Sequence, residues 1–180
     1  MNTREEKPIL CPSGEDFIPC SEEDLAEVES ILGATLPRDY KEFVMKYGWS
    51  HYEPSAVVKT IEKPPSDVTI DDESTVLIGN FFGGDYKGTS LLFHLKISPM
   101  YEFFPKQMLA IADDVMTNQF LLGLAGEERN KIFFWYREGL IEPEHYEEDG
   151  LAVPDDWKYR NLTLVANSLS DLFESIQPEQ

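Results

Sequence analysis

Five short apolar segments follow one another through the middle of the chain, separated by turn-forming residues. They span residues 75–78, 90–95, 108–112, 120–124 and 132–136. Each has the length of a β-strand and is rich in apolar, often β-branched or aromatic residues, which favour strands. Their close spacing leaves little room for crossover helices, so we expect mainly antiparallel pairing. Between the first two segments, Gly83-Gly84-Asp85 is interpreted as a hairpin turn.

Two helical patterns precede this block. Ser21 is a good N-cap residue for the first, and Asp24 is placed to complete a capping box. Gly33 is a candidate for the C-cap of this helix. The second helix is predicted between Pro37 and Gly48, because proline suits the first helical turn. The apolar stripe of the first helix consists of Leu25, Val28, Ile31 and Leu32.

The second helix carries an aromatic face. This face is formed by Tyr40, Phe43, Val44 and Tyr47, which fall at the i, i+3, i+4 and i+7 spacing of a helix. We interpret it as core that packs against the sheet, with Phe43 as an anchor, and not as a cofactor site. A buried hydroxyl needs a hydrogen-bond partner, so the tyrosine hydroxyls are expected to reach the edge of the sheet or solvent.

The order of the elements predicts the fold class. A last strand is expected over residues 162–165, followed by a helix that begins at the cap pair Asn167-Ser168 and ends before Pro178. The stripe of this helix is Leu169, Leu172, Phe173 and Ile176. Helices before and after a block of strands indicate an α+β fold, with the N-terminal helices and the C-terminal helix packed on a central, mainly antiparallel sheet. We expect one domain over residues 1–180, with residues 1–20 as an N-terminal arm.

The chain is strongly acidic. It has 34 Asp and Glu residues against 15 Lys and Arg residues, a formal net charge of −19. Such a charge repels nucleic-acid phosphates and anionic membranes and attracts basic partners, so we expect no nucleic acid and no membrane as a partner. Solubility alone is the alternative explanation of the charge. The N-terminus lacks an apolar signal segment and no run approaches 18 apolar residues, so a cytoplasmic protein is expected.

Residues 141–157, IEPEHYEEDGLAVPDDW, concentrate this charge and are interpreted as a long acidic loop. The stretch has seven carboxylates and neither Lys nor Arg. With two aromatic residues beside the charges, it is the candidate partner-binding site. The site comprises Glu142, Glu144, Tyr146, Glu147, Glu148, Asp149, Asp155, Asp156 and Trp157. A merely soluble loop is the alternative, and the acidic face of the first helix, Glu22, Glu23, Glu27 and Glu29, is the next candidate.

The residue types that usually carry chemistry are scattered. The histidines His51, His94 and His145 stand alone, and His94 lies in a strand pattern as a packed or edge residue. Cys11 and Cys20 have the wrong spacing for a zinc knuckle or a redox pair. No nucleophile elbow, phosphate loop or dinucleotide fingerprint occurs. The Asp113-Asp114 pair is explained most simply by a turn. We therefore expect no catalytic residue, no metal and no cofactor.

The stretch LGATLPRDYKEFVMKYG, after an acidic helix, resembles the signature of the SUKH superfamily, which includes yeast regulators of glucan synthesis and cell-wall assembly. The matching residues are Leu32-Gly33, Leu36-Pro37, Asp39-Tyr40-Lys41 and Phe43. Three later segments, residues 108–126, 130–139 and 165–176, are similar to further family motifs in the same order. The chain departs from the family pattern at Tyr47-Gly48-Trp49, at residues 114–117 and at Tyr136-Arg137, as a divergent branch would.

The resemblance implies an α+β fold with a central sheet, and a binding module in place of an enzyme. Many bacterial members of the superfamily look like immunity proteins that neutralise contact-delivered toxins, often nucleases. Our first hypothesis is an immunity protein that binds a basic toxin domain. The alternatives are a regulatory or scaffold protein of the cell-wall-assembly type, and a small-ligand binder or enzyme with a cleft near Asp113 and Asp114. The oligomeric state is left open.

Overall fold

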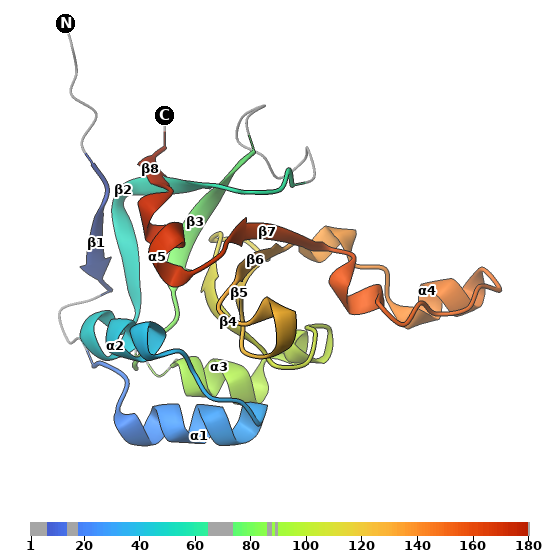
Figure 1. The fold of residues 1–180 in the computed structure, drawn as a ribbon, viewed down its shortest axis with the longest axis horizontal. Coiled ribbons are helices and arrows are strands. Elements are labelled where there is room, and N and C mark those ends of the chain that lie inside the picture. The colour runs from blue at the N-terminus through green and yellow to red at the C-terminus, as the bar shows by residue number, and fades with distance from the viewer. Residues whose placement is uncertain (1–6, 14–17, 65–73, 86–87, 89, 180) are drawn as a thin grey trace, which may run out of the picture.

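The computed structural model describes residues 7–13, 18–64, 74–85, 88 and 90–179. Its centre is a single sheet with helices beside it, which confirms the predicted α+β fold (Figure 1). The strands are β1 (Ile9–Pro12), β2 (Ser50–Lys59), β3 (Thr75–Phe81), β4 (Met108–Asp113), β5 (Gln119–Gly123), β6 (Ile132–Trp135), β7 (Leu162–Ala166) and β8 (Ile176–Pro178). They pair antiparallel in the order β1 to β7, and β8 pairs with β2.

Strand β2 holds both terminal strands on its outer side. Its first half pairs with β1, where Ile9 lies opposite Glu53, and its second half pairs with β8, where Pro178 lies opposite Ala56. The N-terminal arm predicted for residues 1–20 is therefore wrong at residues 9–12, which form a strand. The predicted C-terminal helix is also too long, because Ile176 belongs to β8. Both short strands exist because β2 offers them a free edge to pair with.

The segment that follows β2 covers the opposite end of the sheet. The amides of Ile61 and Glu62 donate to the carbonyl of Leu164 in β7, at 3.1 and 3.0 Å. The Leu164 amide in turn donates to the Glu62 carboxylate at 2.9 Å. The outer edge of β7 is thereby occupied at this point, and the sheet curls back toward its own beginning.

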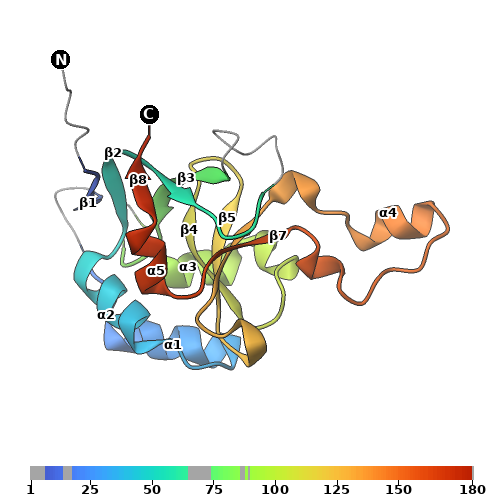
Figure 2. The same ribbon diagram turned by 45° about the horizontal axis from the view of Figure 1, so that its top comes forward.

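The helices are α1 (Glu22–Leu32), α2 (Arg38–Tyr47), α3 (Leu91–Ile97), α4 (Pro143–Glu148) and α5 (Leu169–Glu174). The capping box of Ser21 and Asp24 and the left-handed C-cap at Gly33 are both confirmed. In the stripe of α1, Leu25 and Val28 are buried as predicted, whereas Ile31 is 47% exposed. Figure 2 shows α1 and α2 lying together on one side of the sheet.

The aromatic face of α2 is core, as predicted. The Phe43 ring packs against Phe81 of β3 and Phe173 of α5, with ring centroids 5.2 and 5.0 Å apart. Tyr40 and Val44 are fully buried, and Tyr47 is half-buried. The expectation for the tyrosine hydroxyls is wrong at Tyr40, whose hydroxyl is buried and has no hydrogen-bond partner within the described part of the chain.

The segment 90–95 was predicted as a strand, and this is wrong, because residues 91–95 lie in helix α3. Leu91 and Leu95 are buried four residues apart, which is the spacing of one helical face. The Gly83-Gly84 pair is therefore not a hairpin turn but leads from β3 into this helix, and the Leu91 amide donates to the Gly83 carbonyl at 2.7 Å. A Cβ on Gly83 would lie 2.0 Å from the carbonyl carbon of Gly48, so the glycine permits this close approach of two backbones.

Candidate partner-binding surface

Residues 141–157, here called the acidic arm, project from the body of the molecule between β6 and β7 (Figures 1 and 2). The prediction of a loop is only partly right, because Pro143–Glu148 form helix α4 and a 3-10 turn begins at Trp157. Pro143 occupies the first helical turn, where its missing N–H costs nothing. The left-handed Gly150, with φ +70°, turns the chain back at the far end.

The base of the arm is tied to the sheet by backbone and amide hydrogen bonds. The Tyr136 amide donates to the Asn161 carbonyl at 3.0 Å, and the Asn161 side-chain amide donates to the Tyr136 carbonyl at 3.0 Å. The Arg137 amide donates to the Asn118 side chain at 2.9 Å. These bonds fix where the arm leaves the body, while its outer part stays in solvent.

Two of the seven carboxylates of the arm are paired with flanking arginines. Glu142 lies 3.6 Å from Arg137, and Asp156 lies 3.0 Å from Arg160. The hydrogen bond that Arg160 donates to Asp156 raises the pKa of Arg160 above its ordinary value. The other five, Glu144, Glu147, Glu148, Asp149 and Asp155, are exposed and make no ion pair with any residue that the structure describes. The arm therefore presents a surplus of negative charge to solvent.

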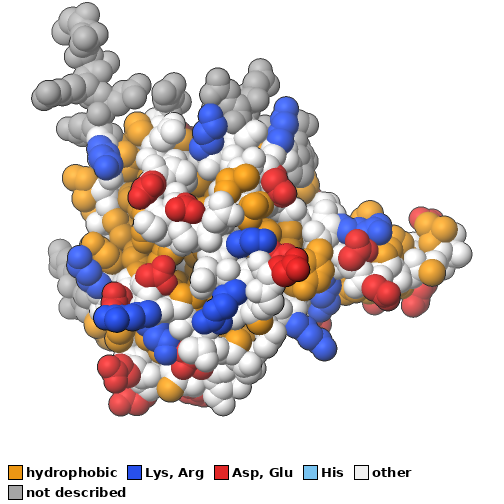
Figure 3. Space-filling model, in the orientation of Figure 1, with side chains coloured by type: hydrophobic (Ala, Val, Ile, Leu, Met, Phe, Trp, Pro, Cys, Tyr) orange, Lys and Arg blue, Asp and Glu red, His pale blue; other side chains and the backbone are white. Residues whose placement is uncertain are grey.

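The apolar residues that the arm exposes are not the two aromatics singled out from the sequence. Tyr146 and Trp157 are half-buried. The larger exposed side chains on the arm are Ile141 and Leu151, at 51 and 58% exposed, and just beyond the arm Tyr159 is 47% exposed. They escaped sequence reasoning because isolated apolar residues in an aperiodic stretch carry no pattern. Figure 3 shows apolar and acidic side chains together on the arm.

The acidic face of α1, the second candidate, has less free charge than the arm. Glu27 forms an ion pair with Lys96 and Glu29 forms one with Lys41, both at 2.6 Å. The hydrogen bond from Lys41 lowers the pKa of Glu29 below its ordinary value. Half of this face is thus neutralised by neighbouring lysines, which leaves the arm as the more strongly charged surface.

The Asp113-Asp114 pair closes a turn, as the sequence predicts. Asp113 accepts hydrogen bonds from the Asn80 and Val115 amides at 2.9 and 3.0 Å. Asp114 accepts from the Asn118 amide at 3.1 Å and from the Asn118 side chain at 2.6 Å. These donors hold Oδ1 of Asp113 and both carboxylate oxygens of Asp114, and so support the turn.

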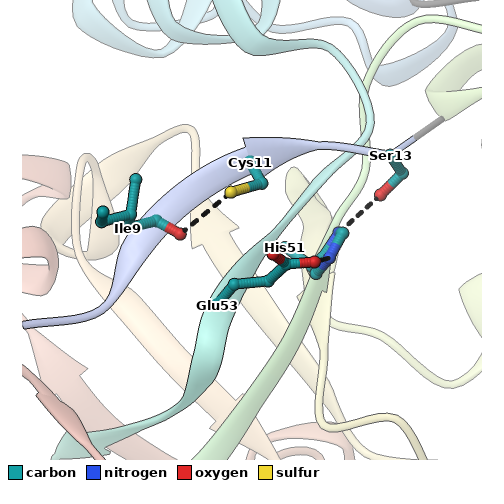
Figure 4. A network of polar contacts seen from close by, with 5 residues as sticks. All are labelled: Ile9, Cys11, Ser13, His51 and Glu53. Carbon is teal, nitrogen blue, oxygen red and sulfur yellow. Dashed lines mark hydrogen bonds and ion pairs between the residues drawn. The ribbon is translucent and has the colours of Figure 1, made fainter. Parts of the chain in front are cut away.

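One polar network was missed from the sequence because Ser13 lies 38 residues from His51. The Ser13 hydroxyl lies 3.0 Å from Nδ1 of His51, and Nε2 of His51 lies 3.0 Å from the Glu53 carboxylate (Figure 4). The order of groups is that of a hydrolytic triad, but Ser13 is buried and its amide donates to the Trp49 carbonyl at 2.8 Å. The network clamps β1 to β2, where Cys11 lies opposite His51.

His94 is half-buried and Cys20 is buried. His94 is packed as predicted, although in a helix: its ring lies 4.6 Å from Phe82, and burial lowers its pKa. Both cysteines are free, and burial raises the pKa of Cys20 to about 12. Among the described residues, no three His, Cys, Asp or Glu side chains come together as metal ligands would. Over the same residues, no helix combines the length and the apolar character that crossing a bilayer requires.

Comparison with known proteins finds similarities over most of the chain. The sequence model of the SMI1/KNR4 family (SUKH-1) matches residues 19–175. The chain is also 28% identical over 166 residues to the SPbeta prophage-derived uncharacterized protein YokK of Bacillus subtilis (strain 168). That similarity covers 87% of this chain and 74% of the relative.

Proposed function

The chain belongs to the SMI1/KNR4 family (SUKH-1), and from this premise we propose that it is a non-enzymatic protein-binding module that neutralises a bacterial toxin by direct binding. Both the immunity proteins and the regulatory proteins of this superfamily act by binding. A relative carried by a Bacillus prophage supports a bacterial setting. The partner proposed here is a basic toxin domain, such as a nuclease that grips phosphate.

The observation that carries the proposal is the acidic arm. Five of its carboxylates form no ion pair with a described residue, and they stand away from the body, where they attract a basic partner before contact. Ile141 and Leu151 are exposed on the same arm and supply apolar contacts that charge alone does not provide. The arm thus combines a charged rim with apolar anchors, which is the composition of a protein-binding surface.

Two other functions are alternatives to toxin neutralisation. A regulatory or scaffold protein would use the same kind of surface on a partner that is not a toxin. An enzyme or small-ligand binder near Asp113 and Asp114 is disfavoured, because amides occupy carboxylate oxygens of both residues. The nature of the partner therefore separates the first two hypotheses.

The first test is whether a toxin gene lies beside this gene, and a neighbourhood without one would favour a regulatory role. The second is growth rescue in bacterial cells that express that toxin domain. Wild type is expected to restore growth. Charge reversal of Glu147, Glu148 and Asp149 to Lys is expected to weaken rescue. A matched control variant carries Lys in place of three exposed carboxylates outside the arm, Glu127, Glu174 and Glu179. Its net charge equals that of the arm variant. No rescue by wild type would contradict toxin neutralisation and favour a regulatory role.

Binding kinetics locate the contact on the arm. Steering by exposed charges is screened over about 10 Å at 0.1 M salt, so the association rate of wild type should fall steeply as salt rises. The arm variant should associate more slowly than the control variant, with a smaller effect on dissociation. If the arm variant associates as fast as wild type at low salt, the partner docks elsewhere.

A further inference from the structure

A groove opens at the base of the acidic arm, on the body of the same molecule. Its volume is about 540 Å³, and it lies between the end of α1, helix α3 and the segment that leads into β4. Its lining is mainly apolar, with two lysines among the lining residues. These residues include Ile31, Tyr101, Phe104, Met108, Lys106 and Lys158.

The two lysines form no ion pair with a described carboxylate, whereas three other lysines do. Lys41, Lys96 and Lys131 each form an ion pair with a glutamate, at 2.6, 2.6 and 3.1 Å. Within the described ranges, neither Lys106 nor Lys158 does so. Lys158 donates instead to the backbone carbonyl of Glu102. The charge of Glu102 acts on Lys158, but neither lysine forms an ion pair with a described carboxylate. In a chain with more than twice as many acidic as basic residues, two such neighbouring cations mark a candidate site for an anionic group.

The two lysines are close enough to affect one another. Burial lowers the pKa of Lys158, and the charge of Lys106 lowers it further, while the charge of Glu102 opposes both effects only in part. An anion placed between two such cations relieves their repulsion. The apolar lining beside them selects an anion that is attached to an apolar group.

The far end of the acidic arm has this chemistry. Glu147, Glu148 and Asp149 are exposed and unpaired with any described residue, and Leu151 follows them at 58% exposure. Within one molecule the two features stay apart, because the far end of the arm points away from the body in both views (Figures 1 and 2). A second molecule can bring them together.

We propose that two copies of this chain exchange their acidic arms, so that the end of each arm lies in the groove at the base of the other. Leu151 enters the apolar groove, and the carboxylates before it meet Lys106 and Lys158. Each groove lies at the base of its own arm. When two arms lie side by side and antiparallel, the far end of each arm is beside the base of the other, so both contacts form at once. The interface is isologous, as in most homodimers.

This dimer goes beyond the proposed function and uses the same arm. A basic partner and the second copy therefore compete for Glu147, Glu148 and Asp149. The test below needs no partner, so a failure of the dimer leaves the proposed function standing.

The experiment is sedimentation of the full chain at 0.15 M NaCl over a range of concentrations. The mass should rise with concentration from 20.6 kDa toward twice that value. Lys106→Glu and the triple variant E147K/E148K/D149K should each sediment as monomers. A mixture of the two variants should form a dimer. In it, the native arm of the Lys106→Glu chain meets the native groove of the triple variant. In the other contact, the lysines of the triple variant meet the new glutamate at position 106.

Lys46→Glu is the matched control. Lys46 is exposed on α2, outside the groove, and its reversal changes the net charge by the same amount. This variant should dimerise like wild type. A wild-type chain that stays monomeric at its highest soluble concentration overturns the proposal. Dimers that persist in Lys106→Glu and in the triple variant overturn it as well, because they use another surface.

Discussion

His94 is a titratable side chain inside a packed environment. Its ring lies between Phe82 and Tyr101, with centroid distances of 4.6 and 6.0 Å. Its Nδ1 atom is buried and has no hydrogen-bond partner among the residues described. Burial lowers the pKa of His94 below its ordinary 6.5, and the charge of Asp113 only partly opposes this. The folded protein thus holds this histidine in its neutral form.

Stability should therefore depend on pH through His94. The His94 ring binds a proton more readily in the unfolded chain than in the folded one. The neutral ring's contribution to the free energy of unfolding is therefore complete above pH 6.5 and is lost as pH falls toward the lowered pKa. The slope from one such group is at most about 1.4 kcal/mol per pH unit. Urea unfolding at pH 7.5 and 5.5 measures it. His94→Gln should flatten the slope and the exposed His145→Gln should not; equal slopes in His94→Gln and wild type would contradict this.

At the scale of elements, helix α2 is held by its aromatic face. Phe43 contacts Phe81, Phe173 and Tyr47 and is only 6% exposed. Phe43→Ala should lower the free energy of unfolding by about 3–5 kcal/mol, through lost burial and the cavity left behind. Ile31→Ala, at a 47% exposed position of α1, is the control and should change it by about 0.5 kcal/mol or less. Chemical denaturation compares them; a Phe43 variant as stable as the control would refute the assignment.

The elements that could be predicted from the sequence are those specified by local rules. Capping at Ser21 and Gly33 and the periodicity of α2 depend on neighbours in the chain. Segment 90–95 was ambiguous, because a short apolar run fits a strand or a helix. Strands β1 and β8 could not be found, since they have no buried face of their own and need the edge of β2.

The same division applies to the candidate site. Its charge could be predicted, because charge is a property of composition. The pairing of Glu142 with Arg137 and the exposure of Leu151 depend on how the arm leaves the sheet, which is a non-local matter. The groove at Lys106 and Lys158 joins residues about fifty positions apart and had no sequence signal.

At the scale of the whole molecule, the net charge of −19 opposes compactness through self-repulsion. The six Lys or Arg ion pairs among the described residues are all at least partly exposed and add little to stability. Raising NaCl from near zero to about 0.15 M should therefore raise the Tm, because repulsion between distant charges is screened over about 8 Å. Thermal melts with sucrose as an uncharged control measure this, and a Tm that falls with salt would show that the ion pairs dominate.

The two ends of the described chain meet on strand β2. Ile9 lies opposite Glu53, Pro178 lies opposite Ala56, and the Glu179 amide donates to the Ser55 carbonyl at 3.0 Å. Along β2, only two residues separate the points where the chain enters the sheet and where it leaves it. The path of the backbone is therefore almost a closed ring. A short linker can join the ends, and new termini opened at Gly150 leave every strand pairing intact, so the fold admits circular permutation.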